Sequence, residues 1–252
     1  MTPIPHSKAQ SVKAQQADNQ LAKNLLIVAL DYPSRQPALE LAEQLAGQVV
    51  WYKVGLELYL AEGRSFVEEL RRRGLRVFLD LKLHDIPNTV AGAVRSAAAS
   101  GAELLTVHTL GGPAMLSAAA EAVEGTGARL LGVTVLTSMD SAQLQAIGVA
   151  QSPTAQVESL ARMGLAAGLK GFVCSPQEVA RLREITGSGT TLVTPGIRPA
   201  GSAVGDQKRV ATPAAALRDG ACFLVVGRPI TQASDPAKAA EAILAEMQGA
   251  LE

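Results

Sequence analysis

Short apolar runs that alternate with amphipathic or alanine-rich stretches constrain the fold of this 252-residue chain more than any other feature. The runs have the length of buried strands, and the stretches between them have the length of helices. We expect strands at Leu25–Leu30, Val49–Val54, Leu75–Leu81, Glu103–His108, Arg129–Leu136, Gly171–Cys174, Thr191–Thr194 and Cys222–Val226. The expected helices are Pro37–Ala46, Glu57–Arg73, Asn88–Ser100, Ala114–Glu124, Thr154–Ala167, Pro176–Thr186, Pro213–Arg218 and Pro236–Met247.

Strands separated by helices pair in parallel, because each helix carries the chain back across the sheet. Eight such units fit an α/β fold of the closed (β/α)8 TIM-barrel type, which we expect over residues 24–252. Residues 1–23 are polar and are expected to form a short, flexible N-terminal extension. A doubly wound open sheet is the alternative, but Asp31-Tyr32-Pro33 stands where its glycine-rich turn belongs.

Composition excludes several classes of function. Basic and acidic side chains balance at 23 each, which argues against a nucleic-acid or membrane-surface role based on bulk charge. No apolar run reaches the length of a membrane span, and residues 1–23 lack the apolar stretch of a signal peptide. We interpret Cys174 and Cys222 as reduced core residues of a cytoplasmic protein. The three histidines are too scattered for a typical zinc cluster, so no metal site is expected.

Polar side chains follow the apolar runs at the strand ends that carry the chemistry of such barrels. They are Asp31, Lys53, Asp80, Lys82, His108, Thr137, Ser138, Arg198 and Arg228. The opposite strand ends show no matching charged set. This distribution predicts a functional site at the C-terminal mouth of the barrel.

The segment from Asp80 to Thr89 is the most informative of these strand ends. Alternate residues of a strand share a face, so Asp80 and Lys82 are expected to point the same way. A charge pair at the end of an apolar strand indicates a site. A structural ion pair, with Asp85 capping the helix near Pro87, is the alternative interpretation.

The expected seventh and eighth strands end in sequences that suit a phosphate group. Loops after these strands are the usual phosphate position in barrels of this type, and Gly227-Arg228 offers close backbone approach and a bidentate guanidinium. A glycine turn with a solvent-facing arginine is the alternative. Between the two strands, the segment 199–211 is expected to act as a lid. Its Gln207 is a candidate phosphate donor, whereas Lys208 and Arg209 are compatible with simple solvation.

Three of these segments resemble a known family. Lys53-Val54-Gly55, Asp80-Leu81-Lys82-Leu83-His84-Asp85-Ile86-Pro87-Asn88-Thr89 and Val226-Gly227-Arg228-Pro229-Ile230 resemble, in order, motifs of the orotidine 5′-monophosphate decarboxylases. The resemblance runs from about residue 24 to the C-terminus. It implies a homodimeric barrel that converts orotidine monophosphate to uridine monophosphate and CO₂ without metal or organic cofactor.

The resemblance also implies roles for individual residues. The catalytic charge array would comprise Lys53, Asp80, Lys82 and Asp85, with Asp85 contributed by the neighbouring subunit. The residues implied to bind substrate are Asp31 and Thr89 at the ribose, Thr137 and Ser138 at the pyrimidine, and Arg198, Gln207, Gly227 and Arg228 at the phosphate. Thr89, like Asp85, would reach in from the partner chain.

Loss of CO₂ leaves an electron pair in the plane of the pyrimidine, where the π system cannot delocalise it. A fixed ammonium in a low-dielectric pocket stabilises such a pair, and Lys82 is the expected cation and proton donor. The interleaved carboxylates are expected to keep both lysines charged and aligned. His84 is expected to be structural, and the role of His108 stays open.

Two other classes of function remain alternatives. A metal-dependent sugar-phosphate decarboxylase, epimerase or aldolase uses the same barrel, but related sugar-phosphate decarboxylases place a magnesium-binding glutamate where Lys53 stands here. A catalytically silent nucleotide-binding or scaffold protein is the second alternative, and the intact lysine–aspartate array argues against it.

Overall fold

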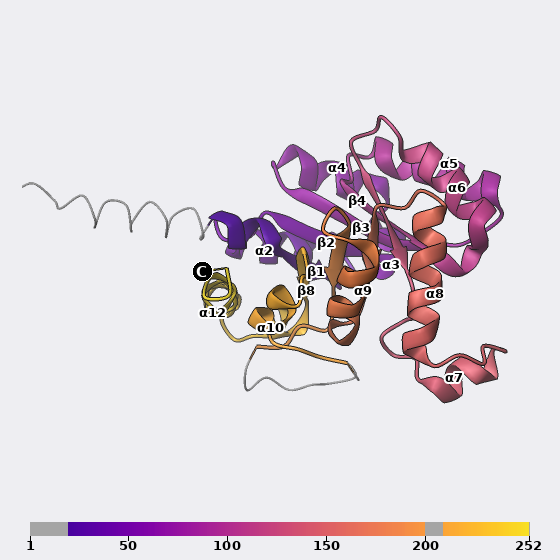
Figure 1. Ribbon diagram of the computed structural model, residues 1–252. Coiled ribbons are helices and arrows are strands. Elements are labelled where there is room, and N and C mark those ends of the chain that lie inside the picture. Colours follow the sequence, from indigo (N-terminus) through magenta and orange to yellow (C-terminus); the bar gives the residue numbers. More distant parts are fainter. Residues whose placement is uncertain (1–19, 200–208, 252) are drawn as a thin grey trace, which may run out of the picture.

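The computed structural model describes residues 20–199 and 209–251. In these ranges eight parallel strands pair in chain order, and the last strand closes a barrel against the first (Figure 1). The strands are β1 (Leu26–Leu30), β2 (Trp51–Gly55), β3 (Arg76–Leu83), β4 (Leu104–His108), β5 (Arg129–Val133), β6 (Gly171–Val173), β7 (Thr191–Thr194) and β8 (Phe223–Val226). The predicted (β/α)8 fold is confirmed.

Helices follow the strands along the chain and surround the barrel (Figure 1). They are α2 (Arg35–Gln44), α3 (Leu56–Glu62), α4 (Arg64–Arg72), α5 (Pro87–Ala99), α6 (Gly112–Val123), α7 (Ser141–Ala146), α8 (Pro153–Ala166), α9 (Val179–Thr186), α10 (Pro213–Arg218), α11 (Arg228–Thr231) and α12 (Pro236–Gln248). Two 3₁₀ turns, η1 (Thr109–Gly111) and η2 (Pro176–Glu178), precede α6 and α9. A side-chain oxygen caps α8, α10 and α12, each of which starts with proline, a residue that suits the first position of a helix.

The helix and strand boundaries depart from the sequence prediction in several places. The helix expected over Glu57–Arg73 is two helices, because Gly63 adopts a left-handed conformation with φ of 68° between α3 and α4. β5 ends at Val133 rather than Leu136. The short helices α7 and α11 were not expected, and Arg228 therefore begins a helix instead of lying in an open loop.

Two apolar layers fill the structure. The inside of the barrel is packed by alternate strand residues, namely Ile27, Ala29, Trp51, Phe78, Leu104, Leu131, Val193 and Val225. A larger cluster, mostly leucine, valine and alanine, fills the space between the strands and the helices. Because inward-facing residues recur every second position, the next inward positions after Ala29 and Phe78 are Asp31 and Asp80. The barrel packing therefore aims these carboxylates at the C-terminal mouth.

The N-terminal end of the barrel carries charges that the sequence analysis missed. Glu103 forms ion pairs with Arg71 and with Arg76, whose Nη2 lies 2.5 Å from Oε2. The Arg76 guanidinium also lies 4.1 Å from the centroid of the Trp51 ring. Burial alone would raise the pKa of Glu103, but the two arginines lower it overall. The prediction that this end of the barrel has no charged set is wrong. Its charged side chains pair with one another and pack on Trp51, so their role is structural.

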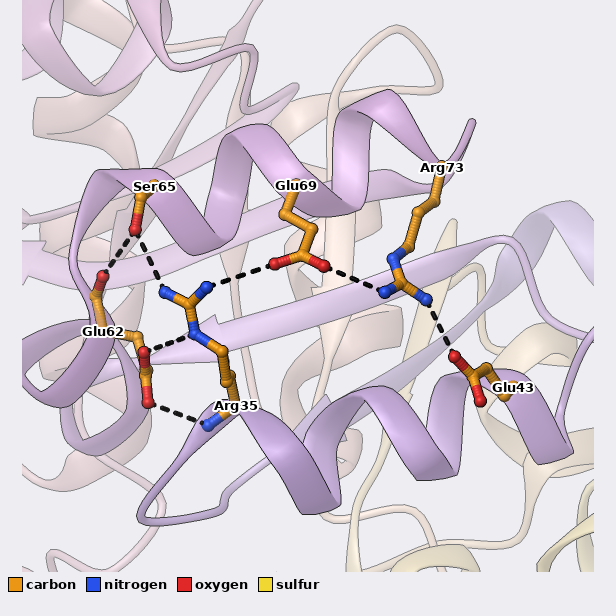
Figure 2. Close-up of polar contacts among 6 residues, drawn as sticks. All are labelled: Arg35, Glu43, Glu62, Ser65, Glu69 and Arg73. Carbon is orange, nitrogen blue, oxygen red and sulfur yellow. Dashed lines mark hydrogen bonds and ion pairs between the residues drawn. The ribbon is translucent and has the colours of Figure 1, made fainter.

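A second network joins α2 to α3 and α4 on the outside of the barrel (Figure 2). Arg35 bonds Glu62 and Glu69, and Arg73 bonds Glu69 and Glu43. Glu69 thus lies between two guanidinium groups. The network holds α3 and α4 against α2.

Two further sequence expectations concern the cysteines and the membrane. Cys174 is buried and Cys222 is partly exposed, and both thiols are free. Burial raises the pKa of Cys174 to about 12, which keeps its thiol protonated. Among the described residues, no helix is both long enough and apolar enough to span a bilayer.

Candidate active site

A cavity of about 270 Å³ opens at the C-terminal end of the barrel. Its floor is the top of the barrel core, at Ala29, Phe78 and Val225. Its walls come from the ends of β1, β2, β3, β5, β6, β7 and β8 or from the segments that follow them. The sequence-predicted site residues that line it are Asp31, Lys53, Asp80, Lys82, Thr137, Arg198, Gly227 and Arg228.

Four of these side chains form a chain of alternating charge on one side of the cavity. Lys53 Nζ lies 2.9 Å from Asp31 Oδ1 and 3.8 Å from Asp80 Oδ2. Lys82 Nζ lies 2.9 Å from both Asp80 oxygens. The side chains of Lys53 and Asp80 are each only 12% exposed, which strengthens their mutual attraction relative to a surface pair. Asp80 is therefore the shared counter-ion of both lysines.

Local backbone features make room for this array. A Cβ on Gly55 would lie 2.9 Å from Lys53 Nζ and 3.4 Å from Asp31 Oδ1, so glycine leaves space for that ion pair. Lys82 has φ of 51° and is the one non-glycine residue with positive φ in the described ranges. Such a conformation is costly for a residue with a Cβ and is typical of functional sites.

The opposite side of the cavity carries arginines and glycines. Arg198 is 9% exposed, and its backbone N–H donates to the carbonyl of Ala211 at 2.9 Å. Arg228 is exposed and begins α11, directly after Gly227. Gly196 and Gly227 both line the cavity. This side offers guanidinium donors and accessible backbone, which are the groups that bind phosphate.

Some predicted residues do not line the cavity. Asp85, Thr89 and Ser138 are exposed. Asp85 Oδ1 accepts a hydrogen bond from the N–H of Ile86 at 2.6 Å, and the N-cap of α5 is Ile86 rather than Asp85. Gln207, and with it most of the expected lid, lies outside the described residues.

A largely buried ion pair next to the lining residues Leu136 and Ser175 was not predicted from the sequence. Arg209 pairs with Glu178 and donates from Nη2 to the carbonyl of Leu136 at 2.9 Å, so it is not merely solvated. Their side chains are 12% and 6% exposed, and burial raises the pKa of Glu178. The pair connects the segments that follow β5, β6 and β7. Arg209 lies in a Gly/Ala/Ser-rich segment, and nothing in that segment of the sequence indicates that its side chain is paired.

The two histidines near the array lie side by side. The ring centroids of His84 and His108 are 5.7 Å apart. Burial lowers the pKa of His108, and the neighbouring His84 and Lys82 lower it further. His108 is therefore neutral at neutral pH and adds no third positive charge beside Lys82.

A (β/α)8 barrel with lysine, aspartate and arginine side chains around a cavity at the C-terminal strand ends has the organisation of a barrel enzyme. The chain belongs to the Orotidine 5'-phosphate decarboxylase / HUMPS family, whose model matches residues 24–243.

Named relatives agree with this membership. An orotidine 5'-phosphate decarboxylase from Anaeromyxobacter sp. (strain K) is 57% identical over 220 residues, covering 87% of this chain and 96% of that protein. One from Halorhodospira halophila is 56% identical over 227 residues, covering 89% of this chain and 96% of that protein. The crystal structure of orotidine 5'-phosphate decarboxylase from Lactobacillus acidophilus has a TM-score of 0.79 and 39% identity, and the match covers 88% of this chain and 98% of that one.

Proposed function

We propose that this protein decarboxylates orotidine 5′-monophosphate to uridine 5′-monophosphate and CO₂ in de novo pyrimidine biosynthesis. The observation that carries the proposal is the chain of contacts from Asp31 through Lys53 and Asp80 to Lys82 in the cavity. The names of relatives that match nearly their whole length support the same reaction.

The cavity suggests one orientation for the nucleotide. The phosphate binds beside Arg198, Gly227 and Arg228. Gln207, which lies outside the described residues, is proposed as a further donor from the family resemblance alone. Asp31 accepts hydrogen bonds from the ribose hydroxyls. The pyrimidine lies toward Lys82, with the lining residue Thr137 at its amide edge and the exposed Ser138 next to it. Its carboxylate then faces the Asp80–Lys82 pair.

The array supplies the chemistry. The bond between C6 and the carboxylate carbon breaks, CO₂ leaves, and the electron pair stays on C6. The Lys82 ammonium, aligned by two contacts with Asp80, stabilises that pair and then transfers a proton to C6. Solvent returns the proton to the amine. Because charge is stabilised by fixed protein groups, the reaction needs no organic cofactor or metal.

We also propose a homodimer in which Asp85 and Thr89 complete the partner's site. Both residues are exposed in the isolated chain, and neither lines its own cavity. Ile86 next to Asp85 is 66% exposed, and Leu110 after β4 is 44% exposed. Apolar side chains at this edge of the mouth fit an interface that brings Asp85 to a neighbouring array.

The charge of Lys53 weighs against a metal-dependent sugar-phosphate enzyme on the same barrel. Its ammonium lies between the Asp31 and Asp80 carboxylates. A divalent cation bound by these two carboxylates would require a further acidic ligand at this position, and a lysine repels it instead. Among the described residues, no group of three or more acidic, histidine or cysteine side chains has the arrangement of a metal site.

Loss of pyrimidine absorbance on mixing the protein with orotidine monophosphate tests the proposal. We expect turnover that is unchanged by a chelator. Activity that a chelator abolishes and Mg²⁺ restores would instead support the sugar-phosphate alternative, to be checked with a pentulose or hexulose phosphate. Binding of uridine monophosphate without any turnover would indicate a silent nucleotide-binding protein.

A further inference from the structure

Thr106 in β4 connects the two central residues of the charge array. Its side chain is 1% exposed. Its hydroxyl oxygen lies 3.0 Å from Asp80 Oδ1 and 2.8 Å from the backbone nitrogen of Lys82. Thr106 therefore touches the counter-ion and the backbone of the proposed proton donor at the same time.

The strand pairing explains why this contact is needed. Leu79 pairs with Leu105 and Leu83 pairs with Val107, so the β3 residues Asp80, Leu81 and Lys82 lie opposite Thr106 alone. A bulge of this kind leaves backbone groups without ladder partners and is common beside active sites. The Lys82 N–H, displaced by the positive φ of its residue, finds its acceptor in the Thr106 hydroxyl.

The chemistry of the three groups fixes the direction of both hydrogen bonds. A backbone N–H can only donate, and an ionised carboxylate can only accept. The single hydroxyl proton of Thr106 must therefore point at Asp80 Oδ1 while its oxygen accepts from Lys82. Asp80 Oδ1 then receives donors from both Thr106 and Lys82 Nζ. One neutral hydroxyl thus fixes the carboxylate and the strained backbone relative to each other.

We propose that Thr106 is a positioning residue that holds the Asp80–Lys82 pair in its reactive geometry; this inference rests on the proposed function. Thr106 does not line the cavity, so it acts through Lys82 rather than on the nucleotide. Losing its hydroxyl leaves the Lys82 N–H unpaired and frees the Asp80 carboxylate to rotate. The proton donor then moves away from C6, while the phosphate and ribose contacts stay intact.

The test compares Thr106→Ser with Thr106→Ala. Both variants lack the methyl group and differ only in the hydroxyl, so their ratio isolates the two hydrogen bonds. With orotidine monophosphate as substrate, we expect kcat of the serine variant to exceed that of the alanine variant at least about fivefold, with KM values within about threefold. The Kd for uridine monophosphate, measured by calorimetry, is expected to be the same in both variants. A kcat ratio below about fivefold, or a loss confined to KM, overturns the proposal.

Thr190→Val is the matched control. Thr190 is a buried threonine directly before β7, at the other end of the barrel, and its hydroxyl donates to the Thr186 carbonyl at 2.9 Å. We expect this variant to lose stability while keeping the parent kcat. A matching loss of kcat in Thr190→Val would mean that general destabilisation explains the Thr106 result, and would overturn the proposal. A parent chain without decarboxylase activity overturns the proposed function as well, whereas an active parent with equal serine and alanine variants overturns only the role of Thr106.

Discussion

Asp80→Asn tests the charge array at its most connected residue. The Asp80 carboxylate accepts two hydrogen bonds from Lys82 Nζ at 2.9 Å, one from Thr106 at 3.0 Å, and lies 3.8 Å from Lys53 Nζ. The substitution keeps the size of the side chain but removes its charge. It also places an NH₂ group, which can only donate, next to one of the ammonium groups. Lys82 then loses the partner that aligns it.

The structure sets the expected size of the effect. A hydrogen bond with a charged partner contributes about 1.5–3 kcal/mol, and losing one such contribution in the transition state lowers kcat about 10- to 150-fold. The Lys82 side chain is 30% exposed, so water compensates part of the lost interaction in the folded state. We therefore expect the free energy of unfolding to fall by only about 1–2 kcal/mol. The substitution is therefore expected to impair kcat strongly while the protein stays folded.

Absorbance kinetics with orotidine monophosphate and urea unfolding measure the two effects on the same preparation. Glu103→Gln is the matched control, because Glu103 is also a partly buried carboxylate with two cationic partners, but at the opposite end of the barrel. We expect it to lose a similar amount of stability and to keep kcat within about twofold. A kcat of Asp80→Asn within about threefold of the parent, or an equal loss of kcat in both variants, would contradict the role of Asp80 as the catalytic counter-ion.

Four further variants test other residues in and around the site. Lys82→Ala is expected to abolish turnover in the absorbance assay while calorimetry still detects uridine monophosphate binding; turnover near the parent rate would remove Lys82 from the role of proton donor. Arg228→Ala is expected to lower kcat/KM at least about tenfold, roughly 1.4 kcal/mol, with unchanged urea unfolding, because it removes the phosphate contact that lies far from the breaking bond. Arg209→Met is expected to lower the free energy of unfolding by about 3 kcal/mol because it leaves the buried Glu178 carboxylate unpaired, and adding Glu178→Gln should recover part of this loss. Burial lowers the pKa of His108 below its ordinary value of 6.5, so the folded protein loses stability as the pH falls below that value. We expect His108→Gln to reduce the difference between the urea midpoints measured at about pH 7 and about pH 5.5. An unchanged difference would contradict this assignment.

The barrel could be predicted from the sequence because the patterns that indicate its strands and helices are local. Continuous apolar runs define the strands, because barrel strands are buried on both faces, and prolines mark several helix starts. Side chains along each strand alternate between the inside and the outside of the barrel. The same alternation carries Asp31 and Asp80 to the mouth as the next inward positions after Ala29 and Phe78. The break at Gly63 was missed because a single glycine within a helical pattern does not reveal a left-handed conformation.

The rest of the site depends on contacts between distant segments. Arg209 and Glu178 meet only after β6 and β7 have paired, and nothing in the sequence near either residue indicates that it has a partner so far along the chain. The contact of Thr106 with Asp80 depends on the bulge in β3, which changes the register between β3 and β4. Asp85 belongs to a different category, because its proposed role requires a second chain.

A crystal structure with uridine monophosphate bound would show directly whether Lys82 faces the reacting carbon. We expect the Lys82 amine to point at C6 of the pyrimidine, next to Asp80 of its own chain and Asp85 of the partner, with the phosphate held by Arg228. A Lys82 side chain turned away from the ring, with a metal ion between Asp31 and Asp80, would contradict this expectation.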